Sequence, residues 1–155
     1  MQHIDVAYAP GLTHWLTGEI KRPVKVATEG DSLSAGSIIV ASSADHLVLR
    51  DGLLRYVVEP AEQIFRPSVD VFFASVVQER VRPSVAILLT GMGRDGAHGM
   101  RSLRDAGWHT IAQDQATSVV WGMPGSAVEM GGVVEILPLD QIGAAASHWV
   151  QSRVA

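Results

Sequence analysis

The sequence predicts an α/β protein with a mainly parallel, doubly wound sheet and flanking helices. Short apolar runs alternate with segments of helical periodicity along most of the 155 residues, which is typical of this class. One run, residues 85–89 (VAILL), is continuously apolar, as expected of a strand buried on both faces of a parallel sheet. A glycine-rich turn at residues 91–96 follows, and a helical segment then ends at Gly107. Because ligands collect at the carboxyl ends of strands in open α/β sheets, this turn and its one acid, Asp95, are the first candidates for a site.

Composition narrows the classes of partner and compartment. A chain of 155 residues with 47% hydrophobic content is predicted to form one domain with a buried core. Its net charge of -4 argues against nucleic acid or an anionic membrane surface as the main partner. It contains no cysteine, which excludes thiolate chemistry and favours the reducing cytoplasm. Its six histidines are scattered and no apolar run reaches membrane-spanning length, so we expect no metal, no cofactor and no direct membrane insertion.

The first part of the chain is predicted to contain a helix, two short strands and a hairpin. The helix shows apolar residues on one face and ends before Pro23. Asp51-Gly52 between two strand-like runs is a strong hairpin signal. The predicted elements are a helix from about Pro10 to Ile20 with Leu12, Trp15, Leu16 and Ile20 on one face, strands at 24–27 and 38–41, and hairpin strands at 46–49 and 53–58.

The remaining elements follow the same alternation. Ser68 is predicted to cap a helix, with Asp70 in the first turn, where the helix dipole favours an acid. Pro124 suits the first turn of a short helix that ends near Met130. The predicted elements are a helix with the stripe Val69, Phe72, Phe73, Val76 and Val77, strands at 108–112 and 133–137, and a closing amphipathic helix from Leu139 to Val150.

The glycine turn also fits the dinucleotide-binding pattern. Gly91-x-Gly93-x-x-Gly96 follows a predicted strand and opens a helix, and Asp114 ends the next strand, where a ribose-binding acid would lie. Against this, most predicted elements precede the turn, whereas the pattern normally follows the first strand of its unit. A carboxylate at Asp95 would also repel a pyrophosphate at the helix N-terminus. Dinucleotide binding therefore stays an alternative, beside the purely structural use of glycine in a tight turn.

Several motifs, in order along nearly the whole chain, resemble the catalytic domain of the chemotaxis protein-glutamate methylesterases, the CheB family. The opening Gln2-His3-Ile4 resembles the family's histidine strand end, and Gly11-Leu12 and Trp15-Leu16 resemble its following helix. The other matching segments are 66–71 (RPSVDV), 90–97 (TGMGRDGA), 110–114 (TIAQD) and 118–124 (SVVWGMP).

The resemblance implies an α/β serine hydrolase that removes methyl groups from glutamyl methyl esters of chemoreceptors and, in some members, deamidates glutamines. His3 lies at the position of the family's general base, and Asp95 lies at that of the aspartate that orients this base. Met92 lies where a backbone N–H could bind the oxyanion of the tetrahedral intermediate. Met123 and Pro124 match a loop expected to face the same cleft.

The family's nucleophile has no counterpart in the chain. In the family it is a serine in an Ala-Ser-x-Gly-Gly turn, one strand and one helix upstream of the histidine. We therefore expect residues 1–155 to be a partial methylesterase catalytic domain without that first strand and helix, without the family's receiver domain, and doubtful as an enzyme alone. Ser42 and Ser43 follow a predicted strand but lack a glycine-elbow context, so we expect no replacement nucleophile.

The resemblance also implies partners. These are the cytoplasmic helices of methylated chemoreceptors and a receiver domain that links the enzyme to a phosphorelay. The alternative from another class is a non-catalytic remnant that still binds a receptor or a signalling partner. A parallel sheet that lacks one strand leaves an unpaired edge and an uncovered apolar face, so we also expect self-association through the sheet.

Overall fold

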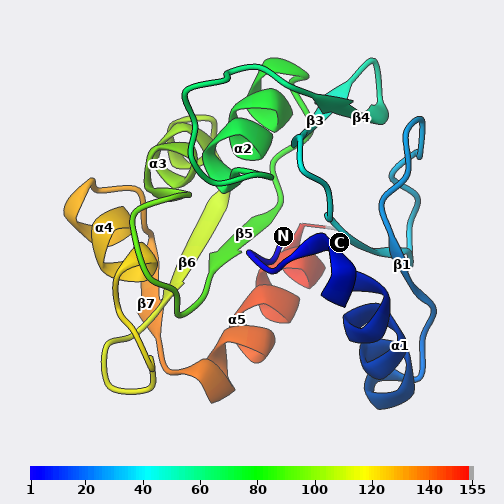
Figure 1. The fold of residues 1–155 in the computed structure, drawn as a ribbon. Helices are drawn as coiled ribbons and strands as arrows, with labels where there is room; N and C mark the ends of the chain where they lie inside the picture. The colour runs from blue at the N-terminus through cyan, green and yellow to red at the C-terminus, as the bar shows by residue number, and fades with distance from the viewer. Residues whose placement is uncertain (154–155) are drawn as a thin grey trace. The chain divides into compact units, whose positions relative to one another are not determined.

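The structure, a computed structural model, describes residues 1–153 and divides into two compact units, Met1–Glu79 and Arg80–Ala155 (Figure 1). The first unit has two two-stranded sheets, the second has one three-stranded sheet, and each unit has its own helices. Across the residues that the structure describes, no helix is long and apolar enough to cross a bilayer. The prediction of a single domain for the whole chain stays a prediction.

The first unit contains one parallel strand pair, one hairpin and two α-helices. β1 and β2 pair in parallel, and β3 and β4 pair antiparallel. The hairpin prediction is confirmed: Asp51 and Gly52 connect the strands with φ of 52° and 72°, the left-handed conformations that a type I′ turn requires. The elements in order are η1 (Val6–Tyr8), α1 (Ala9–Ile20), β1 (Val24–Val26), β2 (Ile38–Val40), β3 (His46–Arg50), β4 (Leu53–Val57) and α2 (Val69–Gln78).

The predicted helix at the start of the chain is confirmed, but its predicted apolar face is only partly covered. α1 has Pro10 in its first turn and ends at Lys21, which has a left-handed φ of 57°. Ala9 and Thr13 are its buried residues, whereas Trp15 is 59% exposed. The helix therefore packs on β1 through a smaller face than its apolar residues suggested.

α2 begins as predicted. The Oγ atom of Ser68 accepts a hydrogen bond from the Val71 N–H at 3.3 Å, which caps the helix. α2 packs on β3, and Ser75 joins the two by accepting the Leu49 N–H at 2.9 Å. This buried hydroxyl satisfies a strand amide that would otherwise lack a partner on that side.

The second unit is a three-stranded parallel sheet in the order β5-β6-β7, with helices on both sides (Figure 1). α3 and α4 lie on one side of the sheet and α5 on the other. This arrangement confirms the α/β class with parallel sheets. The elements in order are β5 (Val85–Leu88), α3 (Ala97–Asp105), β6 (His109–Gln113), α4 (Met123–Glu129), β7 (Glu135–Leu137) and α5 (Leu139–Ser152).

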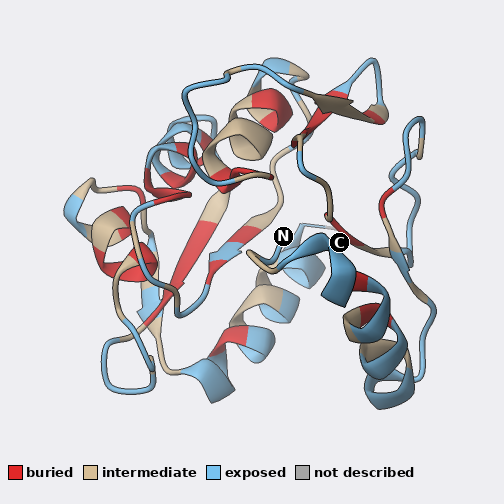
Figure 2. Ribbon diagram, in the orientation of Figure 1, coloured by how far each residue is buried: buried red, intermediate tan, exposed pale blue. Residues whose placement is uncertain are grey.

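The prediction that residues 85–89 are buried on both faces was wrong. Ala86 and Leu88 are buried, but Ile87 is 38% exposed and Leu89, just beyond β5, is 44% exposed (Figure 2). β5 is the end strand of its sheet and pairs only with β6 among the described residues. A continuous apolar run indicates that both faces of a strand can be buried. It does not indicate that another element covers each face. Self-association through this edge stays a prediction.

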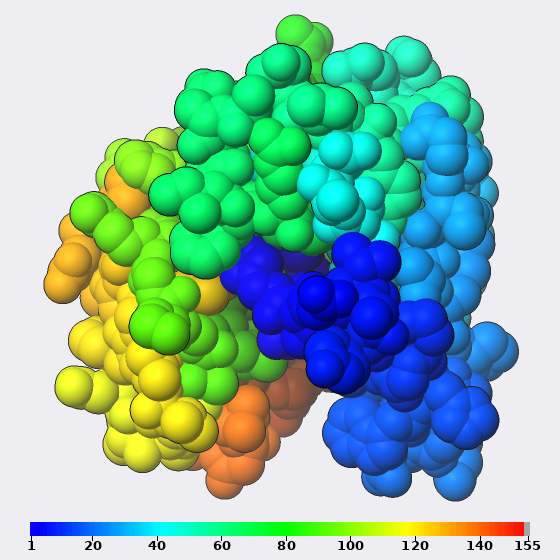
Figure 3. All heavy atoms as spheres, in the orientation of Figure 1, coloured from blue at the N-terminus to red at the C-terminus, as the bar shows by residue number. Residues whose placement is uncertain are grey.

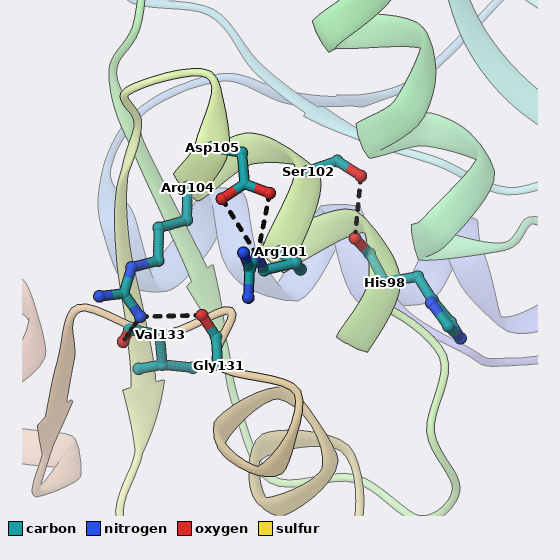
Figure 4. Close-up of polar contacts among 7 residues, drawn as sticks. All are labelled: His98, Arg101, Ser102, Arg104, Asp105, Gly131 and Val133. Atoms are coloured by element: carbon teal, nitrogen blue, oxygen red, sulfur yellow. Dashed lines mark hydrogen bonds and ion pairs between the residues drawn. The ribbon is translucent and has the colours of Figure 1, made fainter.

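The C-terminal end of α3 has the glycine that the sequence predicts, and a side chain of the helix also holds it in place. Gly107 follows the helix with a φ of 85°, and Trp108 N–H donates to the Leu103 carbonyl at 3.0 Å. Arg104 Nη1 donates to the carbonyls of Gly131 and Val133 at 2.8 and 3.0 Å (Figure 4). The end of α3 is thereby tied to the segment that enters β7.

Candidate active site

The turn between β5 and α3 has the conformation that its glycines predict. Gly93 and Gly96 have φ of 94° and 92°, a region where a side chain is strained. Asp95, between them, is 8% exposed. The turn therefore buries its one carboxylate at the N-terminal end of α3, where the positive end of the helix dipole stabilises negative charge.

A second segment, the loop between β6 and α4, is bound to this turn through Gly91. The Gly91 carbonyl accepts the N–H groups of Gly122 and Met123 at 3.1 and 2.9 Å, and the Gly91 N–H donates to the Val120 carbonyl at 3.0 Å. The Oγ1 atom of Thr90 also accepts the Val120 N–H at 2.9 Å. The structure thus brings together the turn that carries Met92 and the start of α4 at Met123, which are 31 positions apart in the sequence.

The two segments are packed so closely that glycine is required at the contact. A Cβ atom on Gly122 would lie 2.8 Å from the Gly91 carbonyl oxygen and 3.0 Å from the Gly93 nitrogen. A Cβ atom on Gly91 would lie 2.5 Å from the Met123 sulfur. At Gly122 the neighbouring atoms belong to the backbone, so glycine there lets one backbone approach the other; at Gly91 the neighbour is the Met123 side chain, which would have to move.

The backbone N–H of Met92 is available to a ligand. Met92 is 80% exposed, and none of the hydrogen bonds within residues 1–153 uses its N–H as a donor. Its neighbour Gly91 is held by three hydrogen bonds. A backbone N–H without a partner among residues 1–153, held on a fixed backbone, is the arrangement that stabilises a developing oxyanion.

Met123 and Pro124 are less accessible than the sequence suggested. Met123 is 8% exposed and packs against Gly91, and Pro124 is fully buried in the first turn of α4. The exposed apolar residues of the loop between β6 and α4 are Val119, at 90%, and Val120, at 44%. This loop, yellow in Figure 3, lies on the surface of its unit. The sequence signal that could have found it is a pair of valines in a loop with no strand or helix to bury them.

His3 belongs to the first unit and Asp95 to the second, and their pairing stays a prediction. The His3 ring is half-buried and stacks on Phe65, with 5.3 Å between ring centroids and 14° between planes. Phe65 follows the hairpin in a loop with no regular structure. Its role could not be predicted from the sequence, because a lone aromatic in a loop carries no periodic signal.

A buried histidine that the sequence analysis passed over closes this loop. His46 is fully buried, its Nδ1 accepts the Ser68 N–H at 3.2 Å, and its Nε2 lies 3.1 Å from the Pro60 carbonyl oxygen. Since Nδ1 accepts a hydrogen bond, the ring proton lies on Nε2, which donates to the carbonyl. His46 therefore joins the two ends of the loop that carries Phe65.

A model of the CheB methylesterase family matches residues 1–146. The chain belongs to the CheB methylesterase family. A protein of Mesorhizobium japonicum named protein-glutamate methylesterase/protein-glutamine glutaminase is 51% identical over 144 residues, which are 92% of this chain and 42% of that protein. A protein of the same name from Cupriavidus pinatubonensis is 48% identical with the same coverage.

A solved structure agrees with this assignment. The CheB methylesterase catalytic domain of Thermotoga maritima superposes with a TM-score of 0.82 at 30% identity, over 94% of this chain and 79% of that one. The chain thus spans less than half the length of the curated relatives it matches. The resemblance to this family that the sequence motifs indicated is confirmed.

Within a CheB domain, the residues that suggested a nucleotide site have structural explanations. The first glycine of the pattern, Gly91, packs against the Met123 side chain, where a Cβ atom would lie 2.5 Å from the sulfur. The Oδ1 atom of Asp114 accepts the Thr117 N–H and Oγ1–H at 2.9 and 2.6 Å, which stabilises the turn after β6. Neither residue needs a bound nucleotide to explain its presence.

Ser42 and Ser43 show no nucleophile geometry in the structure. The Oγ atom of Ser42 is buried without a hydrogen-bond partner among residues 1–153. The Oγ atom of Ser43 accepts the Asp45 N–H at 3.0 Å. An activated serine donates its hydroxyl proton to a base, and neither hydroxyl is hydrogen-bonded to a histidine within the described part of the chain.

Proposed function

We propose that the protein containing this chain is a protein-glutamate methylesterase that hydrolyses glutamyl methyl esters on the cytoplasmic helices of chemoreceptors, and that it also deamidates glutamines there. The observation that carries this proposal is the similarity to relatives with that name, about half identical over 92% of the chain. The fold of a CheB catalytic domain supports it. The chain then works in the cytoplasm, where those receptor helices lie.

In the proposed reaction, the nucleophile is a serine upstream of this chain. His3 takes the proton of that serine as it attacks the ester carbonyl, and Asp95 orients the imidazole and stabilises its cation. The Met92 N–H donates to the oxyanion that forms. His3 then gives the proton to the leaving methoxide, which departs as methanol, and water hydrolyses the acyl-enzyme by the same groups in reverse order.

Two features of the chain support these roles. Met92 is an exposed residue whose N–H donates to no group among residues 1–153, on a backbone that hydrogen bonds hold in place. The His3 ring is held by its stack on Phe65, which restricts its orientation. A general base and an oxyanion donor both need such a fixed position, because misplacement by about 1 Å costs about 100-fold in rate.

The regulatory partner in this proposal is a receiver domain, carried by the same protein or by another. The curated relatives are more than twice as long as the chain, which leaves room for such a domain in them. Phosphorylation of that domain would couple methyl-ester hydrolysis to a phosphorelay.

The test is methanol release from methylated chemoreceptor by the full-length protein that contains this chain. We expect release by the wild type and a fall of about 10³-fold or more for His3→Gln, because a triad works as a unit. His148→Gln is the matched control, since His148 is exposed on α5. Receptor binding without methanol release by the wild type would contradict the proposal and favour the non-catalytic alternative.

A further inference from the structure

Gln113 has a buried side chain that joins the two segments of the candidate site. It is the last residue of β6 and is 1% exposed. Its Oε1 accepts the Thr90 N–H at 2.8 Å, and its Nε2 donates to the Thr117 carbonyl at 2.8 Å. One side-chain amide therefore bonds the residue before the glycine turn and the middle of the loop that leads to α4.

The main chain of the same residue adds a third connection. The Gln113 carbonyl accepts the indole N–H of Trp121 at 3.0 Å. Trp121 in turn pairs with Gly91 in an isolated parallel bridge. The strand end at residue 113 is thus bonded to both sides of the contact that fixes the backbone beside Met92.

We propose that Gln113 is a positioning residue for ester hydrolysis: it holds the 90–93 backbone so that the Met92 N–H meets the oxyanion. The inference rests on the proposed function. Gln113 touches neither the Met92 N–H nor a reacting atom, so it acts through Thr90 and Gly91.

The chemistry of glutamine suits this position better than an acid or an apolar residue of the same length. An amide offers an acceptor and a donor about 2 Å apart, and here both are used by backbone groups of different segments. A carboxylate would keep the Thr90 contact but would face the Thr117 carbonyl without a proton to donate. An apolar side chain would remove the partner of the Thr90 N–H and of the Thr117 carbonyl, two groups whose hydrogen bonds to Gln113 are partly buried.

The position of the amide also predicts which kinetic constant it affects. The oxyanion exists only in the transition state and the tetrahedral intermediate, so a misplaced donor lowers kcat and leaves the binding of the ester nearly unchanged. A residue that only stabilised the fold would lower the amount of folded enzyme and leave the kcat of the folded fraction intact. The ratio of the effects on kcat and KM therefore separates positioning from stability.

The experiment compares Gln113→Met and Gln113→Glu in the full-length protein that contains this chain. Gln115→Glu is the matched control, because Gln115 is two positions away and exposed and takes the same change of charge. Methanol release from methylated receptor gives kcat and KM per folded molecule. Amide hydrogen exchange, measured without substrate, gives the protection of the Thr90 N–H in each variant.

We expect Gln113→Met to lower kcat about 10- to 100-fold with KM within about twofold, since removing an oxyanion donor outright costs about 10²–10³-fold. We expect its Thr90 exchange to rise at least about tenfold, because the hydrogen bond that protects the amide is lost. Gln113→Glu, which keeps the Thr90 contact, should protect that amide better than Gln113→Met. The control should match the wild type in all three quantities.

Two outcomes overturn the inference in different ways. An active wild type with an unchanged kcat in Gln113→Met shows that Gln113 does not position the donor, and the proposed function survives. A wild type that releases no methanol removes the proposed function and with it the positioning role, while the Thr90 exchange still shows whether the amide joins the two segments.

Discussion

Replacing Gly122 with alanine should separate the two segments of the candidate site. The new Cβ atom would lie 2.8 Å from the Gly91 oxygen, and 3.0 and 3.1 Å from the nitrogen and oxygen of Gly93. Ordinary contact begins at 3.4 Å, so the closest approach is about 0.6 Å too short. All three atoms belong to the backbone of the neighbouring turn, which cannot rotate away as a side chain can.

The cost follows from these distances. Overpacking of this kind destabilises by about 1–3 kcal/mol. Alanine also reduces the freedom of the unfolded chain, which returns about 0.4–1 kcal/mol, since the backbone at Gly122 has a φ of -77° that alanine adopts without strain. We therefore expect a net loss of about 1–2 kcal/mol and a kcat lower by about 10- to 100-fold, because the turn that carries Met92 must move.

Chemical denaturation gives the first quantity and methanol release by the full-length protein gives the second. Gly143→Ala is the control, because Gly143 is exposed in the middle of α5 and a Cβ atom there meets nothing within 4 Å. That control should be stabilised by about 0.5–1 kcal/mol and keep its activity. If Gly122→Ala is as stable and as active as this control, the close contact does not hold the turn and the reasoning is refuted.

Three further predictions concern the first unit. Hydrogen bonds from Lys25 and a backbone N–H lower the pKa of Asp31 from 3.8 to about 2. A depressed pKa gives stability that is present above about pH 4 and lost as the pH falls through about 2. Asp31→Asn should therefore make the free energy of unfolding in urea depend less on pH in that window. An unchanged pH dependence would contradict this. His46→Leu should lower the free energy of unfolding by about 1–3 kcal/mol, because the buried Ser68 N–H loses its acceptor on His46. A loss below about 0.5 kcal/mol in the same assay would show that water replaces the ring. Phe65→Leu should lower kcat about 2- to 10-fold, because it frees the His3 ring and an aromatic pair contributes about 0.5–1.5 kcal/mol. Equal rates of methanol release by the variant and the wild type would rule out this role for the stack.

The elements of the fold could be read from the sequence where the signal is local. Asp51-Gly52 gave the hairpin, Ser68 gave the start of α2 and Gly107 the end of α3, since each depends on one residue's backbone preference or hydrogen bond. The exposure of Ile87 could not be read in this way. It depends on which elements cover each face of β5, and this is a property of the assembled sheet.

The residues of the candidate site also differ in whether a local sequence signal points to them. Asp95 became a candidate because a glycine turn after a strand is a local pattern with a known place in the fold. Met92 became one because the resemblance to the family places it beside the site, and the roles of both stay predictions. Gln113 and His46 were missed because each acts through backbone groups far away in sequence, Thr90 in one case and Ser68 in the other. A buried polar side chain is recognised only when its partners are known.

The central claim is that His3 and Asp95 act together as the base and the group that orients it, and a double-variant cycle on methanol release tests it most directly. The variants are His3→Ala, Asp95→Ala and the two combined, each in the full-length protein. If the residues act as a unit, each single change removes most of the activity and the double variant is about as active as His3→Ala alone. If the double variant instead shows the product of the two single losses, His3 and Asp95 act independently and the account is contradicted.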